Sequence, residues 1–302
     1  MPPSSSYSPA PRLWLAAVKP PMYSVAIMPI VIGTIVAYGD TRHFNQSIFY
    51  SFLLAAILIL AWENLSNDLF DSATGIDVNK AHSVVNLTRN HRLVFALANG
   101  CLILGLMAIL TICLTQQDPT VLGLIGLCCL LGYLYQGPPF RLGYQGLGEI
   151  LCFLSFGPLA LGAAYYSQTQ TWSWGSQLAG GIVGLTTSLV LFCSHFHQVQ
   201  DDQAAGKRSP IVRLGTRRSA QLVPWVCALV FALTLLGLAL GVFPTGTMLI
   251  FASAWPAWRL SQHVHRYHDQ PQRISNAKFY AIGFHFWSSL LLTLGFWLSS
   301  LS

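Results

Sequence analysis

The stretch NLSNDLFD, residues 64–71, decides how this sequence is interpreted. It directly follows a long apolar run, although the whole chain of 302 residues has only ten acidic residues. Four of those ten, Glu63, Asp68, Asp71 and Asp77, fall within the fifteen positions 63–77. Such a concentration of carboxylates beside an apolar segment marks the stretch as a candidate functional site.

The spacing within this stretch places three polar side chains together. On a helix at about 100° per residue, Asn64, Asp68 and Asp71 lie within an arc of roughly 60°. Two carboxylates and a carboxamide therefore share one face, and carboxylates this close repel one another unless a positive group lies between them. Mg²⁺ favours one or two carboxylates together with the phosphates of a substrate. The pattern predicts a magnesium site.

The composition predicts a membrane protein. The chain is 53% hydrophobic, has a mean hydropathy of +0.53 and contains only 9% charged residues, whereas a soluble domain normally carries about 25%. A net charge of +6 does not indicate nucleic acid, because the basic residues are not interleaved with aromatic residues on a soluble face. The seven cysteines lie in apolar runs and predict buried thiols rather than disulfides or a zinc site.

We expect an all-α fold, a bundle of nine transmembrane helices, because apolar segments of about 17–25 residues can span a bilayer. Residues 1–11 are rich in Pro and Ser and are expected to be disordered, without the pattern of a signal peptide. Residues 12–302 are expected to form one membrane domain. The expected spans are 21–38, 46–63, 93–114, 119–136, 147–166, 176–195, 220–241, 243–260 and 277–299.

The basic residues predict the topology of these nine spans. The N-terminal tail and the segments after the even-numbered spans hold fifteen of the sixteen Lys and Arg residues, and the other face holds only Arg42. Because Lys and Arg accumulate on the cytoplasmic side, this bias predicts a cytoplasmic N-terminus. It also places the two longest connections, which carry the acidic residues, on the cytoplasmic face.

A second polar cluster, HFHQVQDDQAAGKRSP, covers residues 195–210 at the cytoplasmic end of the sixth span. Gln198 and Asp202 are spaced i, i+4 and share a face, as Asn64 and Asp68 do. Two such oxygen-rich helix ends at one leaflet are suited to hold two Mg²⁺ ions. Lys80, Lys207 and Arg208 are then placed to neutralise an anion bound by the metals, and a diphosphate is the natural candidate.

With these two clusters, the sequence resembles the UbiA superfamily of intramembrane aromatic prenyltransferases. Asn64, Asp68 and Asp71 match the first, NxxxDxxD-like motif of that superfamily. The second motif is usually DxxxD, and here Gln198 stands at the first acidic position while Asp202 matches the last. Asp201 is a candidate to compensate for this departure.

The runs NLSNDLFDSATGID, KAHSVVNLT, YQGPPFRLGYQGLGEI and HFHQVQDDQAAGKRSPIVRLG resemble the branch that prenylates 1,4-dihydroxy-2-naphthoate. The last run is similar to cyanobacterial and plant members, which use a phytyl donor. The resemblance implies an Mg²⁺-dependent reaction of phytyl diphosphate with 1,4-dihydroxy-2-naphthoate, in which CO₂ and diphosphate are lost. It also implies a cyanobacterial thylakoid or plasma membrane more than a plastid membrane, with membrane lipid around the helices.

Several residues have both a functional and a structural interpretation. Lys19 is placed to contact the diphosphate or the aromatic carboxylate, or to anchor at the membrane interface. Arg141 is placed to bind the naphthoate carboxylate, or it only sets topology. His195 is a candidate base or a packed interface histidine. With Asp68, Asp71 and Asp202 as catalytic metal ligands beside Asn64 and Gln198, the candidate substrate-binding residues are Lys19, Asp77, Lys80, Tyr133, Arg141, His195, Asp201, Lys207 and Arg208.

Two alternatives stay open at this point. One is another enzyme of the same superfamily, such as a homogentisate phytyltransferase or a menaquinone-type enzyme with a longer polyprenyl donor. The other is a secondary transporter. A transporter site is expected near the middle of the membrane, at broken helices, whereas these acidic residues lie at the membrane edge on one face.

Overall fold

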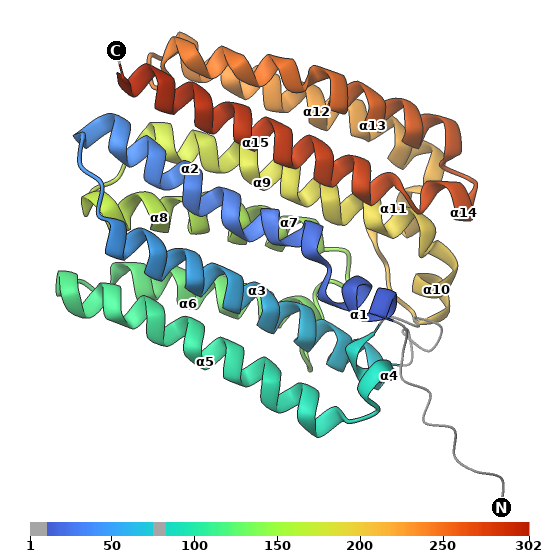
Figure 1. The fold of residues 1–302 in the computed structure, drawn as a ribbon. Helices are drawn as coiled ribbons and strands as arrows, with labels where there is room; N and C mark the ends of the chain where they lie inside the picture. Colours follow the sequence, from blue (N-terminus) through green and yellow to red (C-terminus); the bar gives the residue numbers. More distant parts are fainter. Residues whose placement is uncertain (1–10, 75–82, 302) are drawn as a thin grey trace, which may run out of the picture.

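The computed structural model describes residues 11–74 and 83–301, which form an all-helical bundle (Figure 1). The long helices run side by side across the molecule and are joined at its two ends. They are α2 (Tyr23–Thr41), α3 (Gln46–Thr74), α5 (His91–Gln116), α6 (Thr120–Gln136), α7 (Gly148–Leu154) continuing into α8 (Ala160–Thr169), α9 (Trp174–Ser194), α12 (Thr216–Ala239), the 3₁₀ helix η4 (Thr245–Ser253) continuing into α13 (Ala254–Tyr267), and α15 (Ala277–Leu301).

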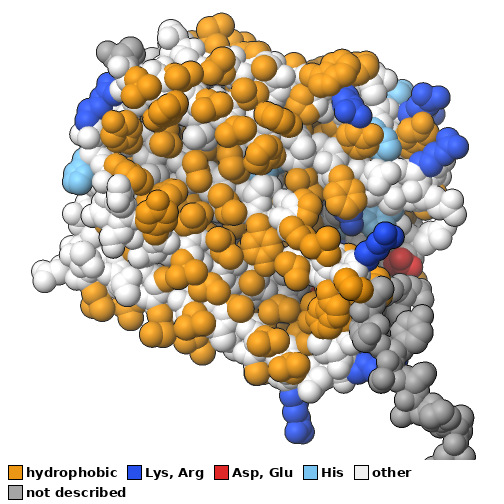
Figure 2. Space-filling view, viewed as in Figure 1, with side chains coloured by type: hydrophobic (Ala, Val, Ile, Leu, Met, Phe, Trp, Pro, Cys, Tyr) orange, Lys and Arg blue, Asp and Glu red, His pale blue; other side chains and the backbone are white. Residues whose placement is uncertain are grey.

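Within the described ranges, seven helical segments are long and apolar enough to cross a membrane, and α6 is a shorter apolar helix. The chain is therefore a multi-pass membrane protein. Hydrophobic side chains cover the middle of the face shown in Figure 2, while Lys and Arg gather toward the right-hand edge. The two remaining predicted spans, 119–136 and 243–260, correspond to α6 and to the η4–α13 pair.

Short helices cluster at one end of the bundle, the end that carries both acidic clusters (Figure 1). Here the chain leaves a long helix, makes a few polar turns and returns to the bundle. These short elements are α1 (Pro11–Val18), η1 (Pro20–Met22), α4 (Val84–Thr88), η3 (His195–His197), α10 (Val199–Ala204), α11 (Pro210–Leu214) and α14 (Pro271–Ile274). The connection after α9 is thus built from short helices.

Helix α3 continues well beyond the predicted span 46–63 and ends at Thr74. The sequence from Gln46 to Thr74 contains neither Gly nor Pro, so nothing in the polar stretch breaks the helix that the apolar run begins. The first acidic cluster therefore lies on the last turns of α3 itself, and its three polar residues share the predicted face.

The predicted span 147–166 is a broken helix. Between α7 and α8 a π-turn, η2 (Ser155–Leu159), contains Pro158, which has no backbone N–H to continue the helical hydrogen bonds. The break packs closely on α9: a Cβ added to Gly157 would lie 2.5 Å from the carbonyl oxygen of Gly180. The turn places Ser155 and Phe156 on the wall of an internal cavity.

Two hydrophobic clusters make up the core of the bundle. One is centred on α9, α12 and α15 and includes Ile182, Val230 and Phe284. The other is centred on α3, α5 and α6 and includes Phe52 and Ile109. Helices α2 and α8 contribute to both. All seven cysteines are free thiols. Five are buried, as predicted, whereas Cys101 and Cys152 are half-buried.

The close approach at Gly157 gives a test of this packing. Gly157→Ala is expected to lower the free energy of unfolding by about 1–3 kcal/mol, because the added methyl group meets backbone atoms that cannot move aside. The apparent melting temperature in detergent measures the loss. Gly123→Ala is the matched control, since a Cβ at Gly123 meets nothing within 4 Å; equal melting temperatures for both variants would contradict the packing argument.

Candidate active site

The first acidic cluster is held by contacts from two other segments. Asp68 is only 1% exposed, and its Oδ2 accepts a hydrogen bond of 2.9 Å from the backbone N of Val84, at the start of α4. Its Oδ1 lies 3.6 Å from Lys19 Nζ, which also donates to Asn64 Oδ1 at 3.4 Å. Lys19 therefore supplies positive charge within this cluster. Its backbone is left-handed, with φ of 52°, a conformation that a non-glycine residue keeps only when its surroundings enforce it.

Asp71, one turn further along α3, contacts the end of α6 and the segment that connects α6 with α7. Its Oδ1 accepts from the Tyr144 hydroxyl and its Oδ2 accepts from Gln136 Nε2, both at 3.4 Å. The Tyr144 hydroxyl also lies 2.7 Å from Thr74 Oγ1. The last turn of α3 is thereby attached to residues about seventy positions later in the chain.

The second acidic cluster depends on a helix C-cap. Gly206, with φ of 72°, ends α10 in a Schellman motif in which the Gly206 N–H donates to Gln203 O and the Lys207 N–H to Asp202 O. The motif turns Lys207 back over α10, so that its Nζ lies 3.4 Å from Asp202 Oδ1. Only 7% of the Lys207 side chain and 1% of the Asp202 side chain are exposed, which makes this a buried ion pair.

Tyr144 links the two clusters. Its hydroxyl binds Asp71 on α3, while its ring centroid lies 5.9 Å from Lys207 Nζ and 6.0 Å from Arg141 Cζ. Its carbonyl oxygen accepts a 2.7 Å hydrogen bond from the Arg208 backbone N. Burial, followed by the negative charge of Asp71, raises the pKa of Tyr144 to about 12, against the opposing effect of the Thr74 hydrogen bond. The phenol therefore keeps its proton at neutral pH and acts as a donor.

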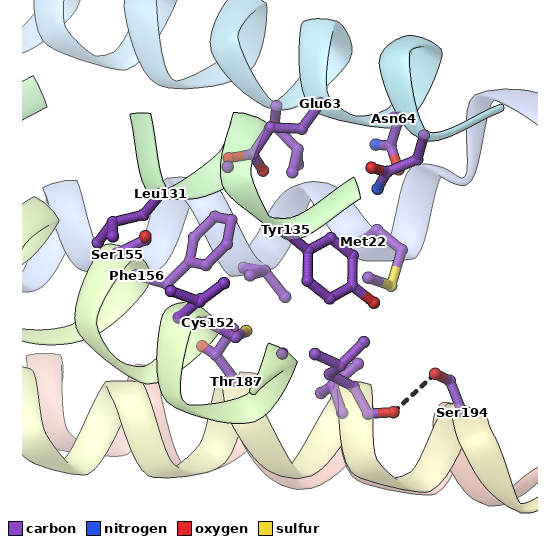
Figure 3. A pocket seen from close by; sticks show the side chains of 18 of the residues that line it. Met22, Glu63, Asn64, Leu131, Tyr135, Cys152, Ser155, Phe156, Thr187 and Ser194 are labelled. Atoms are coloured by element: carbon purple, nitrogen blue, oxygen red, sulfur yellow. Dashed lines mark hydrogen bonds between the residues drawn. The ribbon is translucent and has the colours of Figure 1, made fainter. Parts of the chain in front are cut away.

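Next to these clusters, a cavity opens between α3, α6, α7 and α9 (Figure 3). Glu63 and Asn64 project into it from α3, Tyr135 lies near its centre, and Lys278 at the start of α15 lines it as well. A second cavity shares the walls Leu60, Glu63, Ser155 and Phe156 with the first. It continues into the apolar bundle toward Phe52, Ile109 and Ile125.

The donor set fits Mg²⁺ that is bound together with a phosphate ligand. Among the residues that the structure describes, no three His, Cys, Asp or Glu side chains converge on one point, so a cage made only of protein ligands is not present there. Both carboxylate oxygens of Asp202 are buried without a hydrogen-bond partner, although Oδ1 lies 3.4 Å from Lys207 Nζ, and Asn64 offers its Oδ1 beside Lys19. Oxygen ligands in this number match Mg²⁺, which takes one or two carboxylates plus substrate phosphates and waters.

The other candidate residues are placed as follows. Arg141 has φ of 44°, lies near Tyr144, and its buried Nε has no hydrogen-bond partner. His195 Nδ1 lies 3.1 Å from Glu149 Oε1, and this contact joins η3, directly after α9, to α7. Gln198 is the N-cap residue of α10, without a capping hydrogen bond from its side chain, and its carbonyl oxygen accepts a 2.7 Å hydrogen bond from the Asp202 backbone N. Asp201 and Arg208 are exposed.

Tyr133 does not line the cavity. Its hydroxyl donates to Pro138 O at 2.7 Å, its ring packs edge-on against Phe70, and 38% of it is exposed. Tyr135, two residues later, occupies the cavity wall instead. Two further candidates, Asp77 and Lys80, lie outside the described residues.

Three residues of this region were not singled out by sequence reasoning: Tyr144, Tyr135 as a cavity residue, and Lys278. Tyr144 and Tyr135 lie in or beside the run YQGPPFRLGYQGLGEI, whose density of Gly, Pro and aromatic residues was the available signal. Lys278 carries no local signal, because it is a single cation at the start of an apolar helix and lies more than 200 positions from the first cluster.

This fold and site define a helical membrane protein in which paired acidic and basic clusters flank an internal apolar cavity. The sequence profile of the UbiA prenyltransferase family matches residues 26–290. The chain belongs to the UbiA prenyltransferase family. The resemblance seen in the two acidic clusters is thereby confirmed.

Individual relatives narrow the comparison. The chain is 53% identical over 292 residues to the 2-carboxy-1,4-naphthoquinone phytyltransferase of Synechocystis sp., covering 96% of this chain and 95% of that protein. It is 41% identical to the chloroplastic 2-carboxy-1,4-naphthoquinone phytyltransferase of Arabidopsis thaliana, covering 95% and 77%. A UbiA homolog from Archaeoglobus fulgidus bound to DMAPP and Mg²⁺ superimposes with a TM-score of 0.57 over 93% of this chain and 99% of the other, at 13% identity; this likeness concerns the fold.

The buried pair of the second cluster gives a second test. Lys207→Ala is expected to lower the free energy of unfolding by about 3–5 kcal/mol, because it leaves the buried Asp202 carboxylate without its cation. Thermal denaturation in detergent measures the loss. Arg208→Ala, at the exposed neighbouring position, is the control and is expected to change little.

A double variant distinguishes the loss of the Lys207–Asp202 charge pair from a simple loss of side-chain packing. Lys207→Met combined with Asp202→Leu replaces the ion pair by apolar side chains and is expected to regain most of the lost stability. A double variant as unstable as Lys207→Ala alone would show that pairing of the charges is not what matters at this site.

Proposed function

We propose that this protein transfers a phytyl group from phytyl diphosphate to the ring of 1,4-dihydroxy-2-naphthoate, with loss of diphosphate and CO₂, in phylloquinone biosynthesis. The observation that carries the proposal is the position of the two acidic clusters and their cations beside a cavity that leads into the apolar bundle. A substrate that consists of a diphosphate and a long apolar chain requires a charged site next to an apolar cavity. The names of the two phytyltransferase relatives support the donor and the ring system.

The oxidation state of the acceptor follows from the chemistry. The relatives are named for a carboxy-naphthoquinone, which is the two-electron-oxidised form of dihydroxynaphthoate. Carbon–carbon bond formation with an allylic cation requires an electron-rich ring. We therefore assign the reduced, dihydroxy form as the species that reacts.

In this proposal the metal ligands are Asn64, Asp68 and Asp71 of α3 and Gln198 and Asp202 of the second cluster. When bound, Mg²⁺ would neutralise the diphosphate as its bond to the allylic carbon breaks. Lys19, Lys207 and Arg208 supply fixed positive charge for the same anion, as Lys80 is expected to do from the sequence. Asp77 is the remaining substrate-binding candidate of the first cluster. Tyr144 holds Asp71 in place, and Arg141 is the candidate ligand of the acceptor's carboxylate.

The surrounding helices exclude water from the reacting carbons. Tyr135 and Phe156 place aromatic faces on the cavity wall, and such faces stabilise a nearby cation. The second cavity, between Phe52 and Ile125, accepts the far end of the prenyl chain in this proposal. Tyr133, Asp201 and His195 then act around the site rather than in the cavity.

The membrane arrangement belongs to the same proposal. Residues 12–302 form one domain in which α6 and the η4–α13 pair also cross the bilayer, which gives nine spans. The end with the acidic clusters then faces the cytoplasm, as the distribution of Lys and Arg favours. The membrane is a thylakoid or plasma membrane of cyanobacterial type, in line with the Synechocystis relative.

The first experiment supplies membranes containing this protein with phytyl diphosphate and 1,4-dihydroxy-2-naphthoate, in Mg²⁺ or in EDTA. We expect diphosphate release and a prenylated 1,4-dihydroxynaphthalene, detected as its quinone after oxidation in air, with Mg²⁺ only. A product from homogentisate or from longer polyprenyl diphosphates alone would redirect the assignment within the family. Ion-dependent flux in vesicles without diphosphate release would favour a transporter.

Asp68→Asn is expected to lower the rate of transfer by at least about a hundredfold while the protein stays inserted, because a metal-ligand carboxylate is lost. The rate of diphosphate release measures the effect. Asp269→Asn is the control, since Asp269 is an exposed aspartate outside both clusters, and it is expected to keep wild-type activity. Normal activity in Asp68→Asn would refute the metal assignment.

The second cavity gives a prediction about the length of the prenyl donor. Ala56→Leu fills space there, so it is expected to lower transfer from the C20 phytyl donor while leaving the C10 geranyl donor nearly unaffected. Competition between the two donors measures this preference. Ala96→Leu, at an exposed position of α5, should leave the ratio unchanged; an unchanged ratio in Ala56→Leu would place the chain elsewhere.

A further inference from the structure

A groove on the outer side of the bundle lies between the η4–α13 pair and α15. Its volume is about 570 Å³, within the range of roughly 300–1,000 Å³ that is typical of ligand-binding pockets. Helices α13 and α15 lie at one edge of the bundle (Figure 1). None of the described residues that line this groove also lines either internal cavity. The groove is therefore a candidate binding site separate from the active site.

Two helical stripes form the walls of the groove. Because positions three, four and seven residues apart share a helix face, one stripe of η4–α13 faces one stripe of α15. Arg259 Cζ lies 5.3 Å from the Tyr280 ring centroid, so these two residues mark the same end of the groove. The first stripe is Ala252, Trp255, Pro256 and Arg259, and the second is Phe279, Tyr280, Gly283, Trp287 and Leu291.

The length of the groove matches one leaflet of a bilayer. Tyr280 lies three residues after the start of α15, next to the polar connection that contains α14. From Tyr280 to Leu291 the helix advances eleven residues, or about 16.5 Å at 1.5 Å per residue. Because the hydrocarbon core of a bilayer is about 30 Å thick, one leaflet spans about 15 Å. The groove thus extends from the polar end of the bundle to the middle of the membrane.

Between its ends the groove is apolar and open. Trp255 and Trp287 are 63% and 50% exposed, and Trp255 stacks on Trp258 with ring centroids 4.9 Å apart. Gly283 leaves space between these walls, because a Cβ added there would meet nothing within 4 Å. A hydrocarbon chain that enters from the bilayer can therefore lie along the groove against aromatic side chains.

The polar end of the groove carries positive charge. Among the described residues no ion pair joins Arg259 to a carboxylate, and a guanidinium has five N–H donors that match the oxygens of a phosphate. Residues 254–280 contain four Lys and Arg residues but only one carboxylate, Asp269. In Figure 2, Lys, Arg and His side chains gather near this end of α13 and α15. Such a cluster of cations attracts an anionic headgroup.

We propose that this groove binds one membrane phospholipid with a negatively charged headgroup. The phosphate of the lipid accepts hydrogen bonds from the Arg259 guanidinium, and one acyl chain lies along the groove past Gly283 toward Leu291. The bound lipid fills the space between α13 and α15 and thereby stabilises their packing.

The chemistry of the groove disfavours two other occupants. A prenyl diphosphate carries more negative charge and is bound with metal ligands, whereas one arginine and no carboxylate line this groove in the described part of the chain. A second copy of the chain is disfavoured because helix contacts in membranes are enriched in small residues, and these walls carry tryptophan and phenylalanine. A phosphodiester with one negative charge matches a single guanidinium.

The test titrates the purified protein in detergent with phosphatidylglycerol or phosphatidylcholine that carry the same acyl chains, and native mass spectrometry measures the lipid-bound fraction. Wild-type protein is expected to bind one phosphatidylglycerol about tenfold more tightly than phosphatidylcholine. Arg259→Gln is expected to remove this preference. Arg266→Gln is the matched control and should keep it, because Arg266 lies over Tyr267 in a similar contact, at 5.6 Å, but outside the groove.

A second pair of variants tests the position of the acyl chain. Gly283→Leu places a side chain in the open middle of the groove, so it is expected to lower the affinity for both lipids by about tenfold or more. The rise in apparent melting temperature that phosphatidylglycerol produces should shrink accordingly. Gly123→Leu is the matched control, since Gly123 is exposed on α6 and a Cβ there also meets nothing within 4 Å.

Three results would overturn the proposal: equal affinity of the wild-type protein for both lipids, an Arg259→Gln variant that keeps the preference, or a Gly283→Leu variant that binds phosphatidylglycerol normally. A dimer that dissociates on Gly283→Leu, with or without lipid, would also overturn it, because a second copy of the chain would then occupy the groove. None of these measurements uses the transfer reaction, so the outcome does not depend on the function proposed above.

Discussion

The site depends on one constraint: a carboxylate buried in an apolar bundle must have a partner. Asp68 and Asp202 are each about 1% exposed, and each lies beside a lysine from a segment outside the long helices. Lys19 precedes α2 and Lys207 follows α10. Because removal of a charge from water is costly, these pairings hold the short polar segments against the end of the bundle, beside the cavity. A buried ion pair adds little net stability, so its main effect here is to fix where the segments lie.

The same pairing prepares the site for an anion. Because Lys19 pairs with Asp68 and Lys207 with Asp202, each cluster carries only a small net charge. A diphosphate that binds together with divalent cations adds negative and positive charge in similar amounts, so the net charge of the site stays small. Tyr144 joins the clusters through Asp71 on one side and Lys207 on the other. The polar end therefore behaves as one connected unit. Beyond it, the break at Pro158 moves Ser155 and Phe156 onto the walls of the cavities, which gives an apolar chain space within a bundle that is otherwise packed.

Much of the fold and of the candidate site was predictable from local sequence patterns. The 100° spacing put Asn64, Asp68 and Asp71 on one face, and α3 presents them so. The apolar runs marked the positions of the long helices, although the end of α3 was placed too early because the polar stretch was counted as connection. For Lys19 the sequence left two roles open, and its contacts with Asn64 and Asp68 favour the one in the site. Tyr144 and the His195–Glu149 pair were not predictable as contacts, because their partners lie 46 to 73 positions away.

The sequence alone determined that the helices lie in lipid, that the fold is all-helical and which functional groups the site contains. Scarcity of charge required lipid around the helices, and helical periodicity arranged the carboxylates, since both effects act between residues that are near neighbours in the chain. The tertiary structure decided which cation serves which carboxylate, and that Tyr135 rather than Tyr133 borders the cavity. It also decided that Glu63 stands apart from its acidic neighbours, at the junction of two cavities. These features depend on contacts between helices that are far apart in the chain. The cavities between those helices cannot be predicted from the order of residues.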